Sequence, residues 1–364
     1  MTNKVRAIAF YLPQFYPTPE NDEWWEPGFT EWTNVARAKP LFKGHYQPRI
    51  PRDLGFYDLR VPETREKQAQ LAREAGIEGF CYWHYWFGNG KRLLADVFRE
   101  VVESGKPDFP FCLCWANHSW YAKTWDPNAP DKLLMEQTYP GVEDYEAHFY
   151  EMLPAFKDKR YIKTSDGKLL FGIYAPHNFE DFPAFRDTWD RLALENDLMG
   201  FDFFAFVQGV RNLSQLPSCY DIPIVYDALF DAVEADNAVE QRLFTKVITS
   251  LKNKLRLPVR LTSYMHYAET ALRRFREEPT FIPCINPSFD HSPRSSHKGV
   301  ILYGDNPELW GHLCDAIKEI VDARELDDHF VFIKAWNEWG EGNYMEPDVR
   351  YGKKLIEESG KVFN

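Results

Sequence analysis

The sequence predicts a single (β/α)₈ barrel, and three of its features lead to that prediction. Eight short, β-rich apolar runs recur along the 364 residues, and amphipathic stretches with a helical pattern lie between them. Strands separated by helices are typical of a parallel sheet, and eight of them favour a closed barrel over an open sheet. No internal repeat, low-complexity tract or long Gly/Ser linker divides the chain, so we expect one domain over residues 1–364.

The predicted strands are short apolar runs of the kind that is buried on both faces in a parallel sheet. In chain order they cover residues 5–11, 79–85, 109–115, 169–174, 201–208, 222–226, 281–286 and 330–336. Helical patterns cover residues 63–75, 92–104, 142–156, 183–195, 238–255 and 307–323. Gly76 after the first helix and Asn306-Pro307 before the last agree with helix-end preferences. The pattern is weakest over residues 212–280, where the sixth strand is the least certain in position.

The composition limits the classes of protein to which the chain can belong. Hydrophobic residues make up 44% and charged residues 27%, as in soluble globular proteins. The formal net charge of −12 repels phosphate backbones, so we expect no nucleic-acid partner. The longest basic block, at residues 273–276, is interpreted as the exposed side of a short helix. No apolar stretch reaches the length of a membrane span. The sequence leaves the oligomeric state open.

The six cysteines and the N-terminus bear on the cellular compartment. The cysteines are scattered without a CxxC pair, and most lie in predicted strands, which favours buried reduced thiols over disulfides or a zinc site. The apolar run at residues 7–12 is too short for a signal peptide, and Pro13 ends it. We therefore expect a cytoplasmic protein, or an exported one whose leader has been removed.

Tryptophans gather where predicted strands end. Ten of the twelve fall in four segments, each at or just after the C-terminal end of a strand. In a barrel those ends share the face that builds the active site. Indoles with interspersed polar groups describe a ligand cleft, and sugar rings suit it because they offer flat C–H faces and hydroxyls. We expect Trp32, Trp115 or Trp125 in its wall, whereas Trp83 and Trp336 lie inside strands and are expected to serve as packing.

Glu338 and Glu341 are the predicted chemical pair. They follow the last predicted strand directly, with Trp336 and Trp339 close by. On a helical turn, residues three apart share a face with Cβ atoms about 5–6 Å apart. Retaining glycosidases hold their two carboxyl groups comparably close. Crowding and aromatic walls should raise the pKa of one carboxyl, leaving a proton donor beside an ionised partner. The alternative for two glutamates at this spacing is that both are solvent-exposed acids of a loop.

Several familiar motifs do not occur in the sequence. There is no HExxH, no GxSxG and no Cys/His ligand spacing, so we expect neither a catalytic metal nor a cofactor. There is also no D-x-D pair, a common clamp for metal and diphosphate in nucleotide-sugar transferases. That absence favours a hydrolase without excluding a transferase, because many transferases lack the clamp.

At Glu338, Glu341 and a series of further segments, the chain resembles the WbsX-like proteins, which are related to the glycoside hydrolase family 99 endo-α-mannosidases. The resemblance covers essentially the whole chain, in order, and the combination of motifs is specific. The matching segments are residues 9–15 (AFYLPQF), 28–35 (GFTEWTNV), 44–49 (GHYQPR), 82–87 (YWHYWF), 113–117 (LCWAN), 125–126 (WD), 336–342 (WNEWGEG) and 346–348 (EPD).

The resemblance implies a barrel and a role connected with polysaccharides. It implies that Glu338 is a base that deprotonates the sugar's own 2-hydroxyl, and that Glu341 is the general acid/base. The intermediate would then be a 1,2-anhydro sugar, and the anomeric configuration would be retained. The chain departs from the family at His118 and at Phe289-Asp290-His291, so we expect its substrate to differ from that of typical relatives.

Further polar and aromatic residues are candidates for substrate binding, each with a structural alternative. Glu31 lies among tryptophans and needs a ligand or a partner, for which Arg37 or Arg49 are candidates. Arg294 near His291 could bind an acidic sugar or form a surface salt bridge. Lone histidines and a strand-end tyrosine are often structural. The predicted binding residues are Tyr11, Gln14, Glu31, Trp32, His45, His84, Trp115, Asn117, Trp125, Asp126, Asp290 and Asn337.

Three functions therefore stay open. The first is a retaining glycoside hydrolase that works without metal and could act within a chain. The second is a glycosyltransferase of lipopolysaccharide or surface-polysaccharide synthesis, which basic residues converging on the cleft would favour. The third is a non-catalytic carbohydrate-binding barrel, which two crowded acids oppose.

Overall fold

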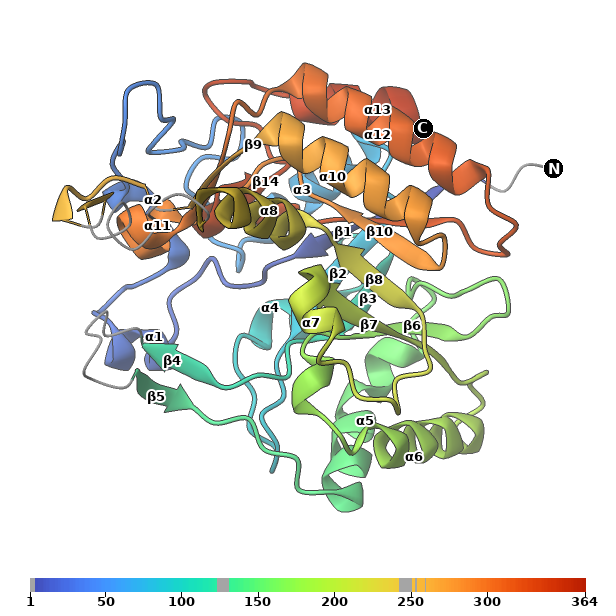
Figure 1. Ribbon diagram of the computed structural model, residues 1–364. Coiled ribbons are helices and arrows are strands. Elements are labelled where there is room, and N and C mark those ends of the chain that lie inside the picture. The colour runs from blue at the N-terminus through green and yellow to red at the C-terminus, as the bar shows by residue number, and fades with distance from the viewer. Residues whose placement is uncertain (1–3, 123–130, 242–250, 253, 259) are drawn as a thin grey trace.

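A closed, all-parallel, eight-stranded barrel forms the centre of the protein, as predicted (Figure 1). The computed structural model describes residues 4–122, 131–241, 251–252, 254–258 and 260–364. The barrel strands are β1 (Arg6–Tyr11), β2 (Gly79–His84), β3 (Phe111–Trp115), β6 (Leu169–Ile173), β7 (Phe201–Gln208), β8 (Ile224–Asp227), β10 (Phe281–Ile285) and β12 (Phe330–Ile333). They neighbour one another in chain order, and β1 closes the barrel against β12 with Arg6 opposite Phe330. All eight strands lie where the apolar runs predicted them.

Helices surround the barrel. They are α1 (Pro19–Trp24), α2 (Glu31–Arg37), α3 (Pro62–Glu74), α4 (Asp96–Ser104), α5 (Val142–Phe156), α6 (Phe182–Glu195), α7 (Gly209–Leu213), α8 (Leu229–Gln241), α10 (Tyr264–Glu277), α11 (Ser292–Ser295), α12 (Pro307–Asp322) and α13 (Lys354–Phe363). Helices α10, α12 and α13 pack side by side on one flank, and α5 packs on α6 on the other (Figure 1). None of these helices is long and apolar enough to cross a bilayer.

The predicted helix ends are confirmed where a local capping residue sets the end of the helix. Asn306 caps α12 by accepting a hydrogen bond from the backbone N–H of Leu309 at 3.0 Å. Gly76 follows α3 with a φ of +72°, a left-handed conformation that suits glycine at a helix end. The helix predicted over 92–104 instead begins at Asp96, because Leu94 has a φ of +54° and interrupts the helical backbone.

Two other sequence-based predictions for the outer helices were wrong in extent. The helix predicted to start at residue 238 starts at Leu229, and its predicted continuation runs partly outside the described residues. The basic block at 273–276 belongs to the 14-residue α10 rather than to a short helix. Phe275 in that block is fully buried, and Arg274 pairs with Asp231 at 3.1 Å. Long-range packing of α10 on α8 and α12 decides this region.

The interior of the barrel is tightly filled by large side chains from adjacent strands. Phe10 of β1 stacks on Trp83 of β2 with ring centroids 4.4 Å apart and also contacts Phe206 of β7. At Gly172 of β6 a Cβ atom would meet the ring of Phe204 and the sulfur of Cys114, so the position accepts no larger residue. Such packing makes the barrel a rigid support for its loops.

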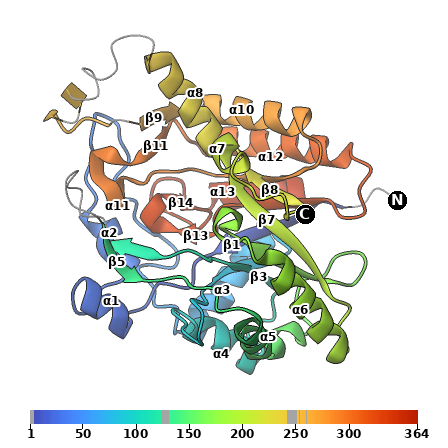
Figure 2. The ribbon, with the colours of Figure 1, turned by 60° about the horizontal axis from the view of Figure 1, so that its bottom comes forward.

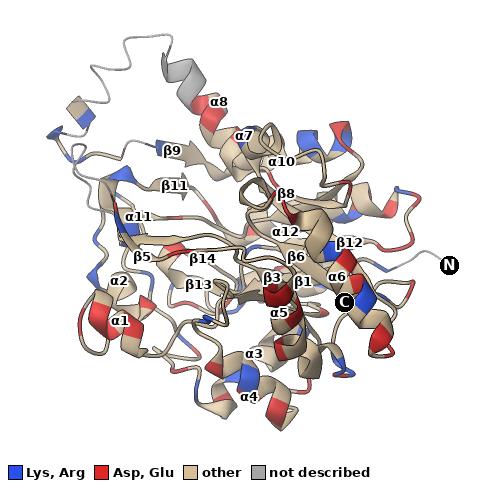
Figure 3. Cartoon of the chain, turned by 90° about the horizontal axis from the view of Figure 1, so that it is seen from below, with Lys and Arg blue, Asp and Glu red and all other residues tan. Residues whose placement is uncertain are grey.

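Loops at the C-terminal ends of the barrel strands carry three small two-stranded sheets. They are β4 (Trp120–Ala122) with β5 (Lys132–Met135), β9 (Arg260–Ser263) with β11 (Val300–Tyr303), and β13 (Asn337–Glu338) with β14 (Asn343–Tyr344). Figure 2 shows β5, α1, α2 and α11 gathered at one end of the molecule, beside β13 and β14. In the view of Figure 3, acidic and basic positions are interspersed, with basic ones near α11.

Candidate active site

Glu338 and Glu341 lie at a tight hairpin directly after β12. Glu338 ends β13, and Glu341 ends the 3₁₀ helix η3 (Trp339–Glu341), which connects β13 to β14. Glu338 lies directly before the 3₁₀ turn, with φ −87° and ψ 63°, and Glu341 is its last residue. The helical turn expected for this pair is therefore replaced by a β-hairpin whose 3₁₀ turn holds Glu341 but not Glu338. Both side chains line the same cleft of about 640 Å³.

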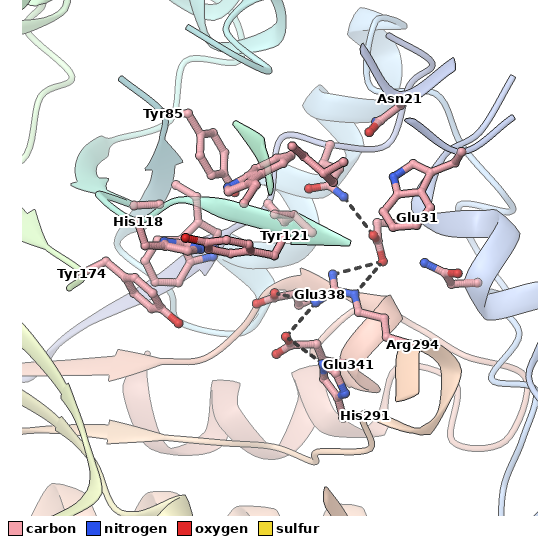
Figure 4. A pocket seen from close by; sticks show the side chains of 18 of the residues that line it. Asn21, Glu31, Tyr85, His118, Tyr121, Tyr174, His291, Arg294, Glu338 and Glu341 are labelled. Carbon is pink, nitrogen blue, oxygen red and sulfur yellow. Dashed lines mark hydrogen bonds and ion pairs between the residues drawn. The ribbon is translucent and has the colours of Figure 1, made fainter. Parts of the chain in front are cut away.

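The cleft opens at the C-terminal mouth of the barrel. Its walls include Leu12 after β1, Trp83 in β2, Ala116 after β3 and Tyr174 after β6. In Figure 4, Tyr85, His118 and Tyr174 lie on one side of the two glutamates, and Asn21 and Glu31 lie on the other. The carboxyl pair therefore lies in the middle of the cleft, with binding surface on both sides of it.

Arg294 of α11 connects the carboxyl groups of the cleft. Its Nη1 donates to Oε1 of Glu341 at 2.7 Å and lies 3.7 Å from Oε1 of Glu338. Its Nε and Nη2 face Oε2 of Glu31 at 3.1 and 3.0 Å. Gln14 donates to the other oxygen of Glu31 at 2.8 Å. Neither Arg37 nor Arg49 partners Glu31, as they pair with Glu26 and Asp305 instead.

Gly340 permits this close approach. A Cβ atom at residue 340 would collide with Oε2 of Glu31 and lie 2.9 Å from Nε of Arg294. Because the position has no side chain, the Glu31–Arg294 pair can lie directly against the turn that carries both catalytic candidates. The glycine after Trp339 is thus a packing requirement of the site.

Lys334 supplies a second cation from the floor of the barrel. Its side chain is buried, and its Nζ lies 3.3 Å from Oε2 of Glu341 and 5.1 Å from the centre of the Phe289 ring. Both oxygens of Glu341 are therefore occupied by cationic donors, one by Arg294 and one by Lys334. In contrast, Oε2 of Glu338 is buried without a hydrogen-bond partner.

These surroundings separate the pKa values of the two glutamates, as the crowding of the pair predicted. Burial and the charge of Glu341 raise the pKa of Glu338 above the usual glutamate range. Burial also opposes ionisation of Glu341, but Lys334 and Arg294 outweigh it and hold the pKa of Glu341 below that range. At neutral pH Glu341 carries the charge, and Glu338 is the group that can gain or lose a proton.

Two histidines complete the surroundings of the pair. The Nε2 of His291 lies 3.8 Å from Oε1 of Glu341, and its Nδ1 lies 2.6 Å from Oγ of Ser295. Burial lowers the pKa of His291 and that of His118, which favours the neutral form of both rings. Of the residues at which we expect the chain to depart from the family pattern, His118 and His291 line the cleft, whereas Phe289 and Asp290 do not.

Four of the predicted site residues come together in the cleft, and others brace it from behind. Gln14, Glu31, Glu338 and Glu341 line it. Asn337 is fully buried and holds the backbone of Leu12, accepting from its N–H at 2.7 Å and donating to its C=O at 3.0 Å. Asn117 holds Ala175 in the same two-bond manner, at 2.7 and 3.0 Å. Both asparagines fix loop positions rather than face the cleft.

Several predicted binding residues belong to buried networks outside the cleft wall. His45 Nε2 lies 2.7 Å from Asp290 Oδ2, and both side chains are almost fully buried. His84 pairs with His148, with Nε2 atoms 2.7 Å apart. Tyr11 donates to Gln68 at 2.8 Å. These residues were expected to contact sugar hydroxyls, but each satisfies its polar group within the protein.

The tryptophans of the cleft wall differ from those expected. Trp32 donates to the backbone of Tyr57 at 2.7 Å, and Trp115 donates to that of Trp86 at 2.8 Å, both away from the cleft. Trp336 is buried as expected, but Trp83 lines the cleft instead of serving only as packing. Trp125 and Asp126 lie outside the described residues. Among the residues that the structure describes, the indoles in the wall are Trp25, Trp83 and Trp120.

Lys334 is the main residue that the sequence did not single out for the site. It carries a detectable signal, because a lysine within the apolar run 330–336 must be paired when the strand is buried. Arg294 was expected to bind an acidic sugar or to form a surface salt bridge, and the structure pairs it with carboxyl groups of the cleft, including that of Glu31, which is 263 positions away in the chain. Within the described ranges, no group of three or more His, Cys, Asp and Glu side chains is arranged to hold a metal ion.

Comparison with known families gives one match over almost the whole chain. Residues 7–359 match the family model described as "Glycosyltransferase WbsX". Two curated relatives, each named "Uncharacterized protein WxcX", come from two strains of Xanthomonas campestris pv. campestris. Each is 36% identical over 358 residues, which is 96% of this chain and 48% of the relative. The chain thus spans about half the length of the curated relatives it matches.

Solved structures with the same fold include glycoside hydrolases. A protein described as "Glycoside hydrolase-like protein" aligns with a TM-score of 0.62 and 14% identity over 100% of this chain and 95% of its own. A family 99 endo-alpha-mannosidase from Bacteroides thetaiotaomicron, in complex with bis-tris-propane, aligns with a TM-score of 0.55 and 13% identity over 98% and 95%. At these identities the similarity establishes the barrel fold.

Proposed function

The chain belongs to the WbsX glycosyltransferase family, and we propose that it is an enzyme that cleaves glycosidic bonds with retention of configuration. The barrel carries every described residue of the cleft, so we propose that residues 1–364 act as one catalytic domain. The glycoside hydrolases among its structural neighbours support a glycan substrate.

The observation that carries the proposal is the contact of both glutamates with one nitrogen. Nη1 of Arg294 lies 2.7 Å from Glu341 and 3.7 Å from Glu338. Two contacts of this length to a single atom keep the two Oε1 atoms within about 6.4 Å of each other, at the lower edge of the roughly 6.5–9.5 Å that separates the carboxyl groups of inverting glycosidases. A bound at that edge supports the closer spacing of retaining enzymes, in which no water has to fit between the base and the sugar during the first step.

Glu338 is proposed as the base that takes the proton of the sugar 2-hydroxyl. Its Oε2 has no hydrogen-bond partner and is therefore available to a substrate hydroxyl. Burial raises the pKa of Glu338, which makes its carboxylate a stronger base near neutral pH. The 2-oxygen of the sugar then attacks the anomeric carbon of the same sugar, which forms a 1,2-anhydro ring and expels the leaving oxygen.

Glu341 is proposed as the acid that protonates the leaving oxygen and later activates water. Arg294 and Lys334 oppose this role in the free enzyme, because they keep Glu341 ionised. The proposal therefore requires that the glycosidic oxygen displace at least one of these cations when the substrate binds, and that the proton held by Glu338 in the free site move to Glu341, which leaves Glu338 ionised as the base. The alternative is that the two glutamates exchange roles, with Glu338 as the acid and Glu341 as the base. This assignment agrees with the free site, in which Glu338 holds the proton and Glu341 is ionised.

A glycosyltransferase is the second candidate, because the family description names that activity and because Arg294 and Lys334 converge on the cleft. A nucleotide-sugar donor would need cations that are free to bind a diphosphate. Here three carboxyl groups, those of Glu31, Glu338 and Glu341, already partner the two cations. That balance favours the hydrolase.

The test is a screen of defined glycans and activated aryl glycosides for cleavage, beginning with α-mannosides, with the Glu341→Gln variant as control. We expect cleavage with retained configuration by NMR of the first product. Matched substrates with a 2-deoxy or 2-O-methyl reacting sugar should bind but not turn over. Rapid turnover of a 2-deoxy substrate, or an ester trapped on Glu338, would replace the 2-hydroxyl scheme with double displacement. Consumption of a nucleotide sugar without glycan cleavage would establish the transferase.

A further inference from the structure

The aromatic side chains that line the cleft differ sharply in exposure. Trp83 in β2 and Tyr85 directly after it are only 6% and 7% exposed. Trp25 and Tyr121, which also line the cleft, are 48% and 50% exposed. Large aromatic side chains left half open beside a cleft mark a contact surface for a ligand, because burying them would be favourable. The exposed rings are therefore candidate binding area within the cleft that holds the carboxyl pair.

The backbone beneath Tyr121 is shaped to direct side chains into the cleft. In the hairpin, Trp120 pairs with Met135 and Tyr121 pairs with Leu133, so Leu134 is an extra residue in β5. Such an irregularity re-aims side chains that would otherwise alternate between the two faces. As a result Trp120, Tyr121 and Leu134 all line the cleft.

The segment that carries Trp25 is braced against this hairpin. Trp24 meets Trp120 edge to face, with ring centroids 6.0 Å apart, and Figure 1 shows α1 beside β4. Trp25 itself leans on Phe29, another cleft residue, at 5.7 Å. The exposed rings are thus attached to supported elements, which reduces the entropy lost when they bind a ligand.

We propose that Trp25 and Tyr121 form an outer platform that binds sugar residues of the same glycan chain beyond the residue held at the carboxyl pair. The rings of Trp25 and Tyr121 are uncharged and suit sugars, whose C–H faces stack on aromatic rings. The inference rests on the proposed function for the identity of the ligand. It adds that the enzyme recognises a chain of several sugars rather than a single one.

The experiment first measures binding of the intact chain to a printed array that carries each glycan at several chain lengths. Calorimetry then measures the affinity for each length of the glycan that binds most tightly. The Glu338→Gln substitution is present throughout to prevent turnover. Affinity should rise with chain length, and Trp25→Ala and Tyr121→Ala should each reduce that rise by about three- to tenfold. Trp25→Phe should keep most of it.

Tyr150→Ala is the matched control, because Tyr150 is 51% exposed but lies on α5, outside the cleft. An unchanged rise with chain length in the Trp25 and Tyr121 variants, equal binding of single sugars and long chains, or no binding at all would overturn the platform. Length-dependent binding that the variants lose, without any cleavage of glycans, would support the platform and reject the hydrolase. Cleavage of glycans together with binding that does not depend on chain length would support the hydrolase and reject the platform.

Discussion

Glu341 accepts a hydrogen bond from Nη1 of Arg294 at 2.7 Å, a contact between residues 47 positions apart in the chain. Lys334 occupies the other oxygen of Glu341, whereas Oε2 of Glu338 has no partner. The two glutamates are near neighbours in sequence and in space, but their surroundings give them opposite proton affinities. Each of the first three predictions below depends on this asymmetry.

The pH dependence should separate the two possible roles of Glu338. If Glu338 is the base, it must be ionised, so on activated aryl glycosides, whose departure needs no proton, kcat/KM should rise with pH through the raised pKa of Glu338. If Glu338 is the acid and the already ionised Glu341 is the base, kcat/KM on the same substrates should not rise through that value. We expect the rising profile in steady-state measurements with activated aryl glycosides, and Glu338→Gln should abolish this limb.

The quality of the leaving group should distinguish Glu338 from Glu341. Glu338→Gln should lose about 10²–10⁴-fold in rate on every substrate, because the amide cannot act as a base. Glu341→Gln should be slow on natural glycans but much less impaired on activated aryl glycosides, whose departure needs no proton. The opposite pattern, with Glu338→Gln rescued by a good leaving group, would assign the acid role to Glu338.

Arg294→Gln should move the pH profile to higher pH. The guanidinium favours ionisation of both glutamates, so its removal should raise both pKa values, by about one unit or more for a contact of this kind. The measurement is the midpoint of the kcat/KM profile, with thermal unfolding to confirm a folded variant. Arg37→Gln removes an exposed ion pair with Glu26 and should leave the midpoint in place. No shift in Arg294→Gln would argue against electrostatic control of the pair.

Glu346 should stabilise the floor of the site. Its carboxyl group accepts hydrogen bonds from Trp339 at 2.6 Å, Tyr57 at 2.8 Å and Gln68 at 2.6 Å. Glu346→Ala leaves these donors unsatisfied and should lower the free energy of unfolding by about 3 kcal/mol, measured in urea. Glu308→Ala, on the exposed face of α12, should change it little.

The effect of Glu346 should also depend on pH. Burial raises the pKa of Glu346 to about 7, above its value of about 4.3 in the unfolded chain. The group therefore stabilises the fold most at low pH and less as pH rises through about 7. The difference in stability between wild type and Glu346→Ala should accordingly narrow from about pH 5 to pH 8, and a widening difference would contradict this account.

Activity should survive chelation. Two glutamates suffice for acid and base chemistry, and the sequence offers no metal-ligand spacing. Incubation with EDTA followed by dialysis should leave the rate of glycan cleavage unchanged. Complete loss of activity that a divalent ion restores would reject the metal-independent mechanism.

The sequence by itself determined the barrel and the location of its chemical pair. Each strand is a local apolar run, and such runs are buried whatever surrounds them, so all eight could be found in the sequence. Glu338 and Glu341 follow the last run directly, and chain connectivity alone places them at the mouth of the barrel. Family resemblance added the expected roles of the two acids, which the predictions above test.

Only the tertiary structure decided which other side chains face the cleft. His45 and Asp290 lie 245 positions apart and form a buried hydrogen-bonded pair, while Glu31 pairs with Arg294 across 263 positions. Residue type and spacing cannot separate these outcomes, because a buried polar group needs a partner and the partner is set by closure of the barrel and packing of its loops. The same packing places Lys334 beneath Glu341 and so decides which of the two glutamates carries the charge.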